Sequence, residues 1–202
     1  WAIATTNGTP GDINLATNNL SLQNGSIVAN ATFGSAQGGT INIDVDQAVD
    51  INSSILSNAS LNQDEEGNAG EINLNTQRLF LSNGGIIVAT TLGDGNGGDV
   101  NINATESFIV EGQEPLGGVI GSGLYADSQD QANGKGGTLQ IETPLLIVRD
   151  GAGISTSAGT SVQLVPEPSS QSLSPESRTP ALTRLSRSQG FGSQGPRQSQ
   201  RQ

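Results

Sequence analysis

The chain has 202 residues, a formal net charge of −11, and no Cys, His or Met. The lack of Cys excludes disulfides and thiolate sites, and the lack of His excludes imidazole acid–base catalysis and the usual zinc and copper sites. No apolar run approaches the length of a transmembrane helix. Because repeat-like sequence follows directly after Trp1, we expect a piece of a longer protein whose signal peptide would lie upstream.

A five-residue phrase, in which glycine is followed by alternating polar and aliphatic residues, recurs along the chain. Its five instances begin at Gly11, Gly39, Gly70, Gly98 and Gly137, with spacings of 28, 31, 28 and 39 residues. Self-similarity at such a period is typical of stacked repeats. The phrase therefore indicates architecture more strongly than chemistry.

Each repeat holds three short runs, which are clearest after Gly70. Ile72 and Leu74 mark the first run, Leu79 and Leu81 the second, and residues 86–88 a less regular third. Period-2 alternation predicts strands with one buried face. The Asn-Gly, Gly-Gly and Asp-Gly pairs between runs predict turns, because these residues tolerate positive φ.

Three strands per repeat fit either one coil of a parallel β-helix or hairpins in an antiparallel sandwich. Equivalent residues keep their chemistry between repeats, and stacking of like on like in a β-helix explains this. We therefore predict an all-β parallel β-helix of about five coils over residues 1–161. Two inward columns are expected, Ile13, Ile41, Ile72, Val100 and Leu139, and Leu15, Ile43, Leu74, Ile102 and Ile141. Two asparagine columns that could bond along a ladder are also expected, Asn14, Asn42, Asn73 and Asn101, and Asn24, Asn52 and Asn83.

The second repeat shifts by about one residue, since Val49 and Ile51 stand where Leu20 and Leu22 would. Insertions then follow at residues 63–67 and around residues 113–122. Both lie between recognisable runs, so neither is expected to break the stack, and loops in solenoids collect on one face.

From about Val162 the pattern stops, and a stretch rich in Ser, Pro, Gln and Arg runs to Gln202. We predict a disordered tail over residues 162–202, protease-sensitive from about Ser169, because it has too little apolar area to offset its ordering entropy. Residues 1–159 carry a net charge of −14, whereas the remainder carries +3. The tail arginines could contact an anionic surface, or the tail could be a solvated spacer.

One Gly-rich turn contains weak calcium candidates, Asp94, Asn96 and Asp99. It resembles the turns of nonapeptide-repeat toxins, and oxygen ligands on a tight turn suit a hard cation. The motif occurs only once in that form, so the alternative interpretation is a structural turn that binds no calcium. Only Asp12, Glu71 and Asp99 recur at one repeat position.

Two acidic clusters are candidates for catalysis, Asp44 with Asp46 and Asp50, and residues 64–66. Parallel β-helix pectate lyases use such carboxylates with calcium and an Arg or Lys base. Here the repeats offer three cations on different coils and no His. We interpret the acids as a solvated face and predict no catalytic residue, with a paired-carboxylate glycosidase as the alternative.

The repeats resemble those of filamentous-haemagglutinin-like exoproteins of two-partner secretion, and look most like the cyanobacterial variety. Residues 70–74, 79–84 and 86–98 carry this resemblance, which covers about residues 8–159. It implies a right-handed parallel β-helix shaft outside the cell or at its outer surface, often in adhesion. The secretion domain that an outer-membrane transporter recognises is not part of this sequence.

We therefore expect a structural or adhesive extracellular segment without catalysis. Its expected partners are a cell-surface glycan or neighbouring cell and, through an upstream domain, an outer-membrane transporter. An acidic, aromatic-poor surface repels nucleic acid and anionic membranes, so neither nucleic-acid binding nor membrane insertion is expected. The alternatives are a carbohydrate-active β-helix enzyme and a calcium-stabilised glycan-binding module, and no cofactor other than calcium is considered.

Overall fold

The computed structural model describes residues 2–4, 10–61, 67–112, 121–128, 134–156 and 162–165. Side chains are described in these ranges except at residues 2–4 and 162–165. All of these residues belong to one compact unit, Trp1–Ser169. No helix long and apolar enough to span a membrane occurs among them.

The described residues form two sheets in which every strand pair is parallel. The first sheet consists of β1 (Ala2–Ala4), β3 (Ile27–Thr32), β5 (Ile55–Ser60), β7 (Ile86–Thr91), β9 (Gly123–Tyr125) and β12 (Gly153–Ser155). The second consists of β2 (Ile13–Gln23), β4 (Thr40–Asn52), β6 (Glu71–Ser82), β8 (Val100–Glu111), β10 (Leu139–Glu142), β11 (Leu146–Arg149) and β13 (Val162–Val165). Parallel pairing excludes the antiparallel sandwich and confirms the predicted β-helix.

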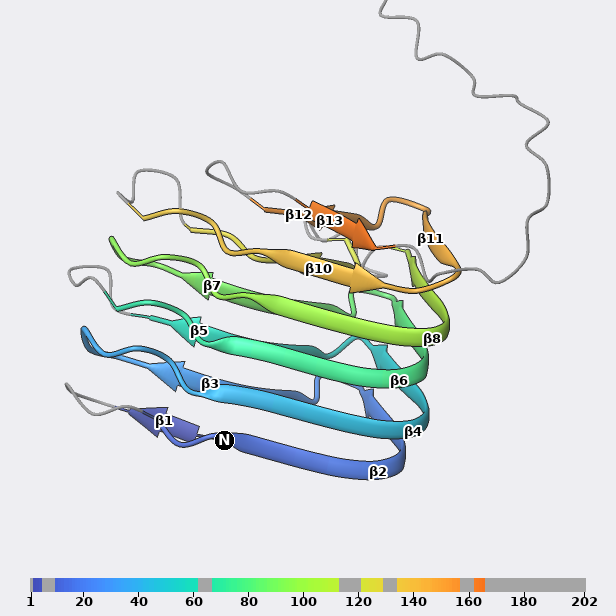
Figure 1. Ribbon diagram of the computed structural model, residues 1–202, viewed down its shortest axis with the longest axis horizontal. Helices are drawn as coiled ribbons and strands as arrows, with labels where there is room; N and C mark the ends of the chain where they lie inside the picture. Colours follow the sequence, from blue (N-terminus) through green and yellow to red (C-terminus); the bar gives the residue numbers. More distant parts are fainter. Residues whose placement is uncertain are drawn as a thin grey trace, which may run out of the picture. The chain divides into compact units, whose positions relative to one another are not determined.

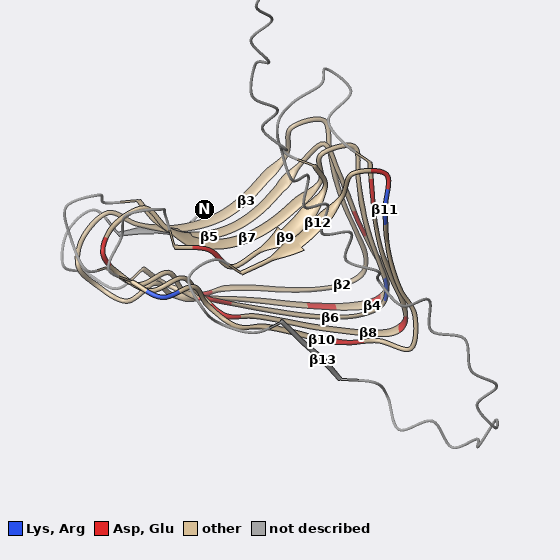
Figure 2. Ribbon diagram, turned by 90° about the horizontal axis from the view of Figure 1, so that it is seen from above, with Lys and Arg blue, Asp and Glu red and all other residues tan. Residues whose placement is uncertain are grey.

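The strands stack from β2 at the bottom of Figure 1 to β10 and β13 at the top. Seen from above in Figure 2, the chain runs along the first half of the long strands, turns a corner into a second side that is labelled β11, and turns again to return through the short strands. It rises one level with each circuit in the sense of a right-handed coil (Figures 1 and 2). Four regular coils begin with β2, β4, β6 and β8, and β10 to β12 form a further coil with shorter strands.

Each long strand bends at a bulge near its middle. The register shifts between Thr17 and Asn19 in β2, between Asp44 and Ala48 in β4, and between Thr76 and Arg78 in β6. Such a bulge kinks a strand, which produces the corner in Figure 2. The first two predicted runs of a repeat are therefore two arms of one strand. We call residues 13–17, 41–45, 72–76, 100–104 and 139–142 the first arm, and residues 19–23, 48–52, 78–82, 107–111 and 146–149 the second arm.

The two predicted inward columns are confirmed. Ile13 pairs with Ile41, Ile41 with Ile72, Ile72 with Val100 and Val100 with Leu139. The column of Leu15, Ile43, Leu74, Ile102 and Ile141 has the same register. Both columns lie in the buried core except at β2, where the side chains are half-buried. Each buried aliphatic side chain contributes about 1.5–3 kcal/mol.

From the second repeat onward, the glycine that opens a repeat is required by the close approach of successive coils. A Cβ at Gly70 would overlap the carbonyl oxygen of Gly39, and a Cβ at Gly98 would overlap that of Gly70. Gly137 meets Gly98 in the same way. At Gly11, in the first regular coil, a Cβ would meet nothing within 4 Å. The repeat phrase therefore begins with glycine for a steric reason that acts between coils.

The second expected asparagine column is wrong at one position. The turn after the second arm holds Asn24, Ser53 and Asn83 at φ of 57°, 46° and 50°. Asn52 lies one residue earlier and pairs with Gln23 and Ser82. The bulge in β4 contains one residue more than β2 and β6 have there, so a constant offset from Asn24 reaches Asn52 and misses the turn.

The paired strands extend past the boundary expected after residue 161. Strand β13 pairs in parallel with β10, from Leu139 and Val162 to Glu142 and Val165. The expected disorder and protease sensitivity of the tail fall on residues 166–202, outside the described residues, and stay predictions.

The two expected insertions do not interrupt the stack. Residues 62–66 and 113–120 lie outside the described residues, but the strands on either side of each keep their register. This part of the prediction is confirmed.

Candidate functional site

A row of asparagines on the outward side of the first arm bonds from coil to coil. The Nδ2 of Asn42 donates to Oδ1 of Asn14 over 2.8 Å, Asn73 donates to Asn42 over 3.0 Å, and Asn101 to Asn73 over 2.9 Å. We call these four residues the amide ladder. Every rung runs in one direction, with the higher coil donating to the lower. The first asparagine column of the sequence analysis is thereby confirmed.

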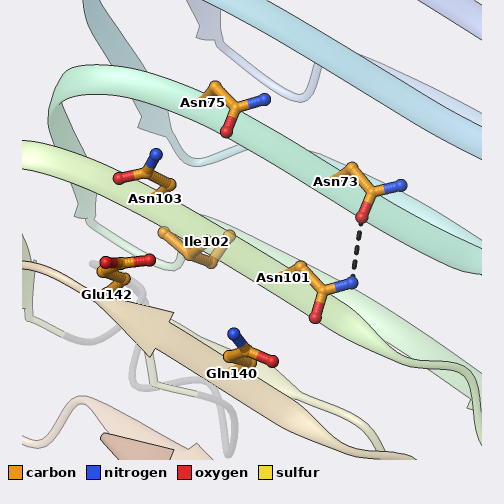
Figure 3. Close-up of a pocket in the computed structure, with 7 residues that line it drawn as sticks. All are labelled: Asn73, Asn75, Asn101, Ile102, Asn103, Gln140 and Glu142. Atoms are coloured by element: carbon orange, nitrogen blue, oxygen red, sulfur yellow. Dashed lines mark hydrogen bonds between the residues drawn. The ribbon is translucent and has the colours of Figure 1, made fainter. Parts of the chain in front are cut away.

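A second outward column lies beside the amide ladder. It contains Asp44, Asn75, Asn103 and Glu142, which are register partners on β4, β6, β8 and β10. Its lowest rung is closed, since Nδ2 of Asn75 donates to Oδ1 of Asp44 over 2.8 Å. No hydrogen bond joins the side chains of Asn103 and Asn75, or of Glu142 and Asn103, among those drawn in Figure 3.

A depression of about 210 Å³ lies where the rungs are missing. We call it the amide depression. It is lined by Asn73, Asn75, Asn101, Ile102, Asn103, Gln140 and Glu142 (Figure 3). Among these side chains, the Asn101–Asn73 rung is the one hydrogen bond that Figure 3 marks. The Oδ1 of Asn103 is shielded from solvent and has no hydrogen-bond partner.

The chemistry of β10 explains why no rung joins β10 to β8. In the amide ladder the higher residue must donate, but the Glu142 carboxylate above Asn103 is an acceptor when ionised. Gln140 stands above Asn101 and carries one methylene more than asparagine, so its amide does not lie where the asparagine repeat would place it. The row of side-chain hydrogen bonds in the amide ladder therefore ends at β8.

The three weak calcium candidates lie by the Gly-rich turn before β8, and two of them help to join coils. Oδ1 of Asn96 accepts from the backbone N–H of Lys135 over 2.9 Å, and Oδ1 of Asp99 accepts from that of Thr138 over 2.7 Å. Asp12 accepts from Thr40 in the same way over 2.7 Å. Asp94 also takes part in an interaction. One oxygen of each of Asn96 and Asp99 is thus committed to stacking.

A second depression, of about 230 Å³, lies beside this turn. Its lining includes Gln37, Asn68, Glu71, Asn96 and Asp99. Several of these polar groups are already satisfied across coils, since Asn68 Nδ2 donates to Gln37 Oε1 over 3.1 Å and Asn68 Oδ1 accepts from the Asn96 N–H over 2.7 Å. This depression therefore has less free hydrogen-bonding capacity than the amide depression.

The acidic candidates on β4 are not brought together. Asp44 lies on the first arm of β4, Asp46 lies in the bulge, and Asp50 lies on the second arm. The cluster at residues 64–66 lies outside the described residues. Across the described part of the chain, no three Asp, Glu, His or Cys side chains come close enough to hold a metal ion.

Two arginines make ion pairs on the second arm. Arg78 lies 3.8 Å from Glu106, and Nε of Arg149 donates to Glu111 over 2.6 Å. The hydrogen bond and charge of Glu111 raise the pKa of Arg149 above its ordinary value. Both arginines are largely exposed, so these pairs tie adjacent coils weakly.

Comparisons with protein-family models, with curated proteins and with solved structures find no match to this chain. The strand register itself makes it a β-helix repeat protein.

Gln140 and Glu142, the residues of β10 that line the amide depression, were not predicted as site residues from the sequence. The signal was present, because the fifth repeat phrase has Gln140 where the other four have asparagine. Its meaning depends on knowing that these asparagines bond to one another in one direction.

Proposed function

We propose that this chain is a structural and adhesive segment of a large secreted surface protein of the filamentous-haemagglutinin-like type, exported by two-partner secretion, as in cyanobacteria. The observation that carries the proposal is the strand register, which sets the same side chains above one another in successive coils. A surface that repeats with each coil suits extension and many weak contacts. An active site instead needs different groups gathered at one place.

The charge of the repeats supports a place outside the cell or at its outer surface. Residues 1–159 carry −14, which favours solubility and disfavours contact with nucleic acid or anionic lipid. The proposed partners are a glycan or a neighbouring cell, and an outer-membrane transporter that would act through a domain upstream. Membrane insertion is not part of the proposal.

Catalysis is also not part of the proposal. The repeats have three cations, and two of them, Arg78 and Arg149, are paired with glutamates on the second arm. Asp44 and Asp50 lie on different arms of their strand, so they do not form the facing pair of carboxyl groups that glycoside hydrolysis requires.

The test is to incubate the purified chain with acidic and neutral polysaccharides, with and without calcium, and to measure retention and product release. Saturable retention without product is expected. Turnover that disappears when one carboxylate is replaced would overturn the structural assignment and favour an enzyme.

A further inference from the structure

The amide depression differs from the rest of the first arm in its unused hydrogen-bonding capacity. In the lower coils, asparagine amides bond to each other at 2.8–3.0 Å. In the depression, the amide of Asn103 makes no hydrogen bond to Asn75, its partner on the strand below, and the amide of Gln140 makes none to Asn101 (Figure 3). Polar groups left in this way are available to a ligand.

Acceptors outnumber donors in the depression. The Asn103 Oδ1 has no partner, and the Glu142 carboxylate adds two oxygens that only accept when ionised. The Nδ2 groups of Asn73 and Asn75 are already used in bonds to the coil below. A complementary ligand must therefore bring several donors.

Charge narrows the class of ligand further. Glu142 lines the depression, and Asp44 stands in the same column three coils below Glu142. With a net charge of −14 over residues 1–159, a uronic acid, sulfate or phosphate group would be repelled. Hydroxyl groups meet the requirement, because each donates one hydrogen bond and accepts others without charge.

The size of the depression limits the ligand to a small group. A volume of about 210 Å³ lies below the roughly 300–1,000 Å³ of pockets that enclose drug-sized ligands. One sugar ring is the size of hydroxyl-rich group that such a space accommodates.

We propose that the amide depression is a subsite for one uncharged sugar residue of a polysaccharide, held by Asn101, Asn103, Gln140 and Glu142. This inference rests on the proposed function and narrows its glycan partner to a neutral one. Adjacent hydroxyls donate to the Glu142 carboxylate and, once the Asn103 side chain turns its shielded Oδ1 toward the depression, to that oxygen as well. The Gln140 amide donates to a ring or hydroxyl oxygen.

The experiment follows side-chain amide resonances of the full ¹⁵N-labelled chain by NMR. The probes are cellohexaose, mannohexaose and chitohexaose as neutral sugars, and hexagalacturonate as the acidic one. At least one neutral hexasaccharide is expected to shift the Asn101, Asn103 and Gln140 amides saturably, and to leave Asn14 unmoved. Hexagalacturonate should bind at least tenfold more weakly. The proposal is overturned if no neutral probe shifts these resonances at about 10 mM, a concentration that would saturate a millimolar site.

Variants locate the binding. Asn103→Leu is expected to weaken neutral-sugar binding at least tenfold, and Asn14→Leu, at the far end of the amide ladder, is the matched control with unchanged binding. If Asn103→Leu does not fold, Gln140→Leu replaces it, since Gln140 is exposed. Glu142→Gln should lower affinity for the neutral sugar and raise affinity for hexagalacturonate. The preference for the neutral over the acidic hexasaccharide should therefore become smaller or reverse. Equal losses in Asn103→Leu and Asn14→Leu would contradict the proposed location.

Calcium chloride alone is a separate arm. If it shifts the same amides and Glu142→Gln abolishes the shift, the depression is a cation site and the sugar inference fails. Product released from a bound hexasaccharide would overturn the non-catalytic proposal while the subsite stands. Adhesion to polysaccharide without any shift at the depression would overturn the subsite and leave the adhesive proposal intact.

Discussion

The carbonyl oxygen of Gly39 occupies the space into which a Cβ at Gly70 would project, and the Asn58 amide nitrogen lies 2.6 Å from that same point. The two backbones thus touch without any side chain between them. Strands in a sheet lie about 4.8 Å apart, a separation set by backbone hydrogen bonds, so the neighbouring coil cannot move away to make room. Stacking on the coil below therefore dictates glycine at the start of every repeat after the first.

Replacing this glycine should break the stack locally. Gly70→Ala is expected to lower the free energy of unfolding by about 3 kcal/mol or more, because the added methyl group meets backbone atoms that cannot rotate aside. Gly11→Ala, at the same position of the repeat, has open space and should change stability by less than about 0.5 kcal/mol. Denaturant unfolding measures both, and equal losses would contradict the steric account.

The inward columns predict a graded response to truncation. Ile72 is fully buried, whereas Ile13 in the first regular coil is half-buried. Ile72→Ala is expected to cost about 2–5 kcal/mol, and Ile13→Ala roughly half as much. Chemical denaturation of the two variants tests this, and a larger loss at Ile13 would show that the core is not centred on the middle coils.

The direction of the amide ladder can be tested with aspartate. Asn73 must donate to Asn42 as well as accept from Asn101, whereas Asn14 only accepts in the ladder. Near neutral pH, Asn73→Asp removes the donor and places a carboxylate against an acceptor oxygen, at a cost of about 1–3 kcal/mol. Asn14→Asp keeps its acceptor role and should cost less than about 0.5 kcal/mol. Thermal unfolding distinguishes the two, and the opposite order would reverse the assigned direction of the rungs.

Ionisation of Tyr125 is expected to lower the free energy of unfolding at alkaline pH. Burial, and secondly the charge of Asp127, raise the pKa of Tyr125 above its ordinary value of about 10. Since the folded pKa exceeds the unfolded one, the stabilisation is fully present below about pH 10 and is lost as the pH rises through the folded pKa.

Tyr125 is the single tyrosine of the chain, so tyrosinate absorbance in an alkaline titration reports on it alone. Asp127→Asn should lower the midpoint only part of the way to that of free tyrosine, because burial is the larger cause. A titration midpoint at or below that of free tyrosine would contradict the partial burial of Tyr125 beside Asp127.

The inward columns could be predicted because apolar residues mark the buried face of each strand, and the glycine phrase marks where each strand begins. Ile41, Ile72 and Val100 follow their glycines at a constant distance, so register within the first arm could be counted. The position of Asn52 could not be obtained from the same count. A bulge adds a residue at a corner without changing the chemistry on either side of it.

The amide depression could not be predicted for a different reason. It arises from rungs that are not made, between Asn103 and Asn75 and between β10 and β8, and the sequence shows Gln140 and Glu142 as ordinary polar residues of a strand. Only the direction of the lower hydrogen bonds reveals that neither residue continues the row.

The circuits of this chain differ in length, from 28 to 39 residues between repeat glycines, yet each strand meets the same partner positions on the strand beneath it. The alignment of each strand is therefore set by its contacts with the strand below and does not depend on the number of residues in the circuit. New sequence can be inserted at the residues where the circuits differ in length, and the pairing of the strands on either side is expected to stay unchanged. The loops of this architecture can therefore change while the strand register stays the same, which makes it a convenient host for grafted peptides.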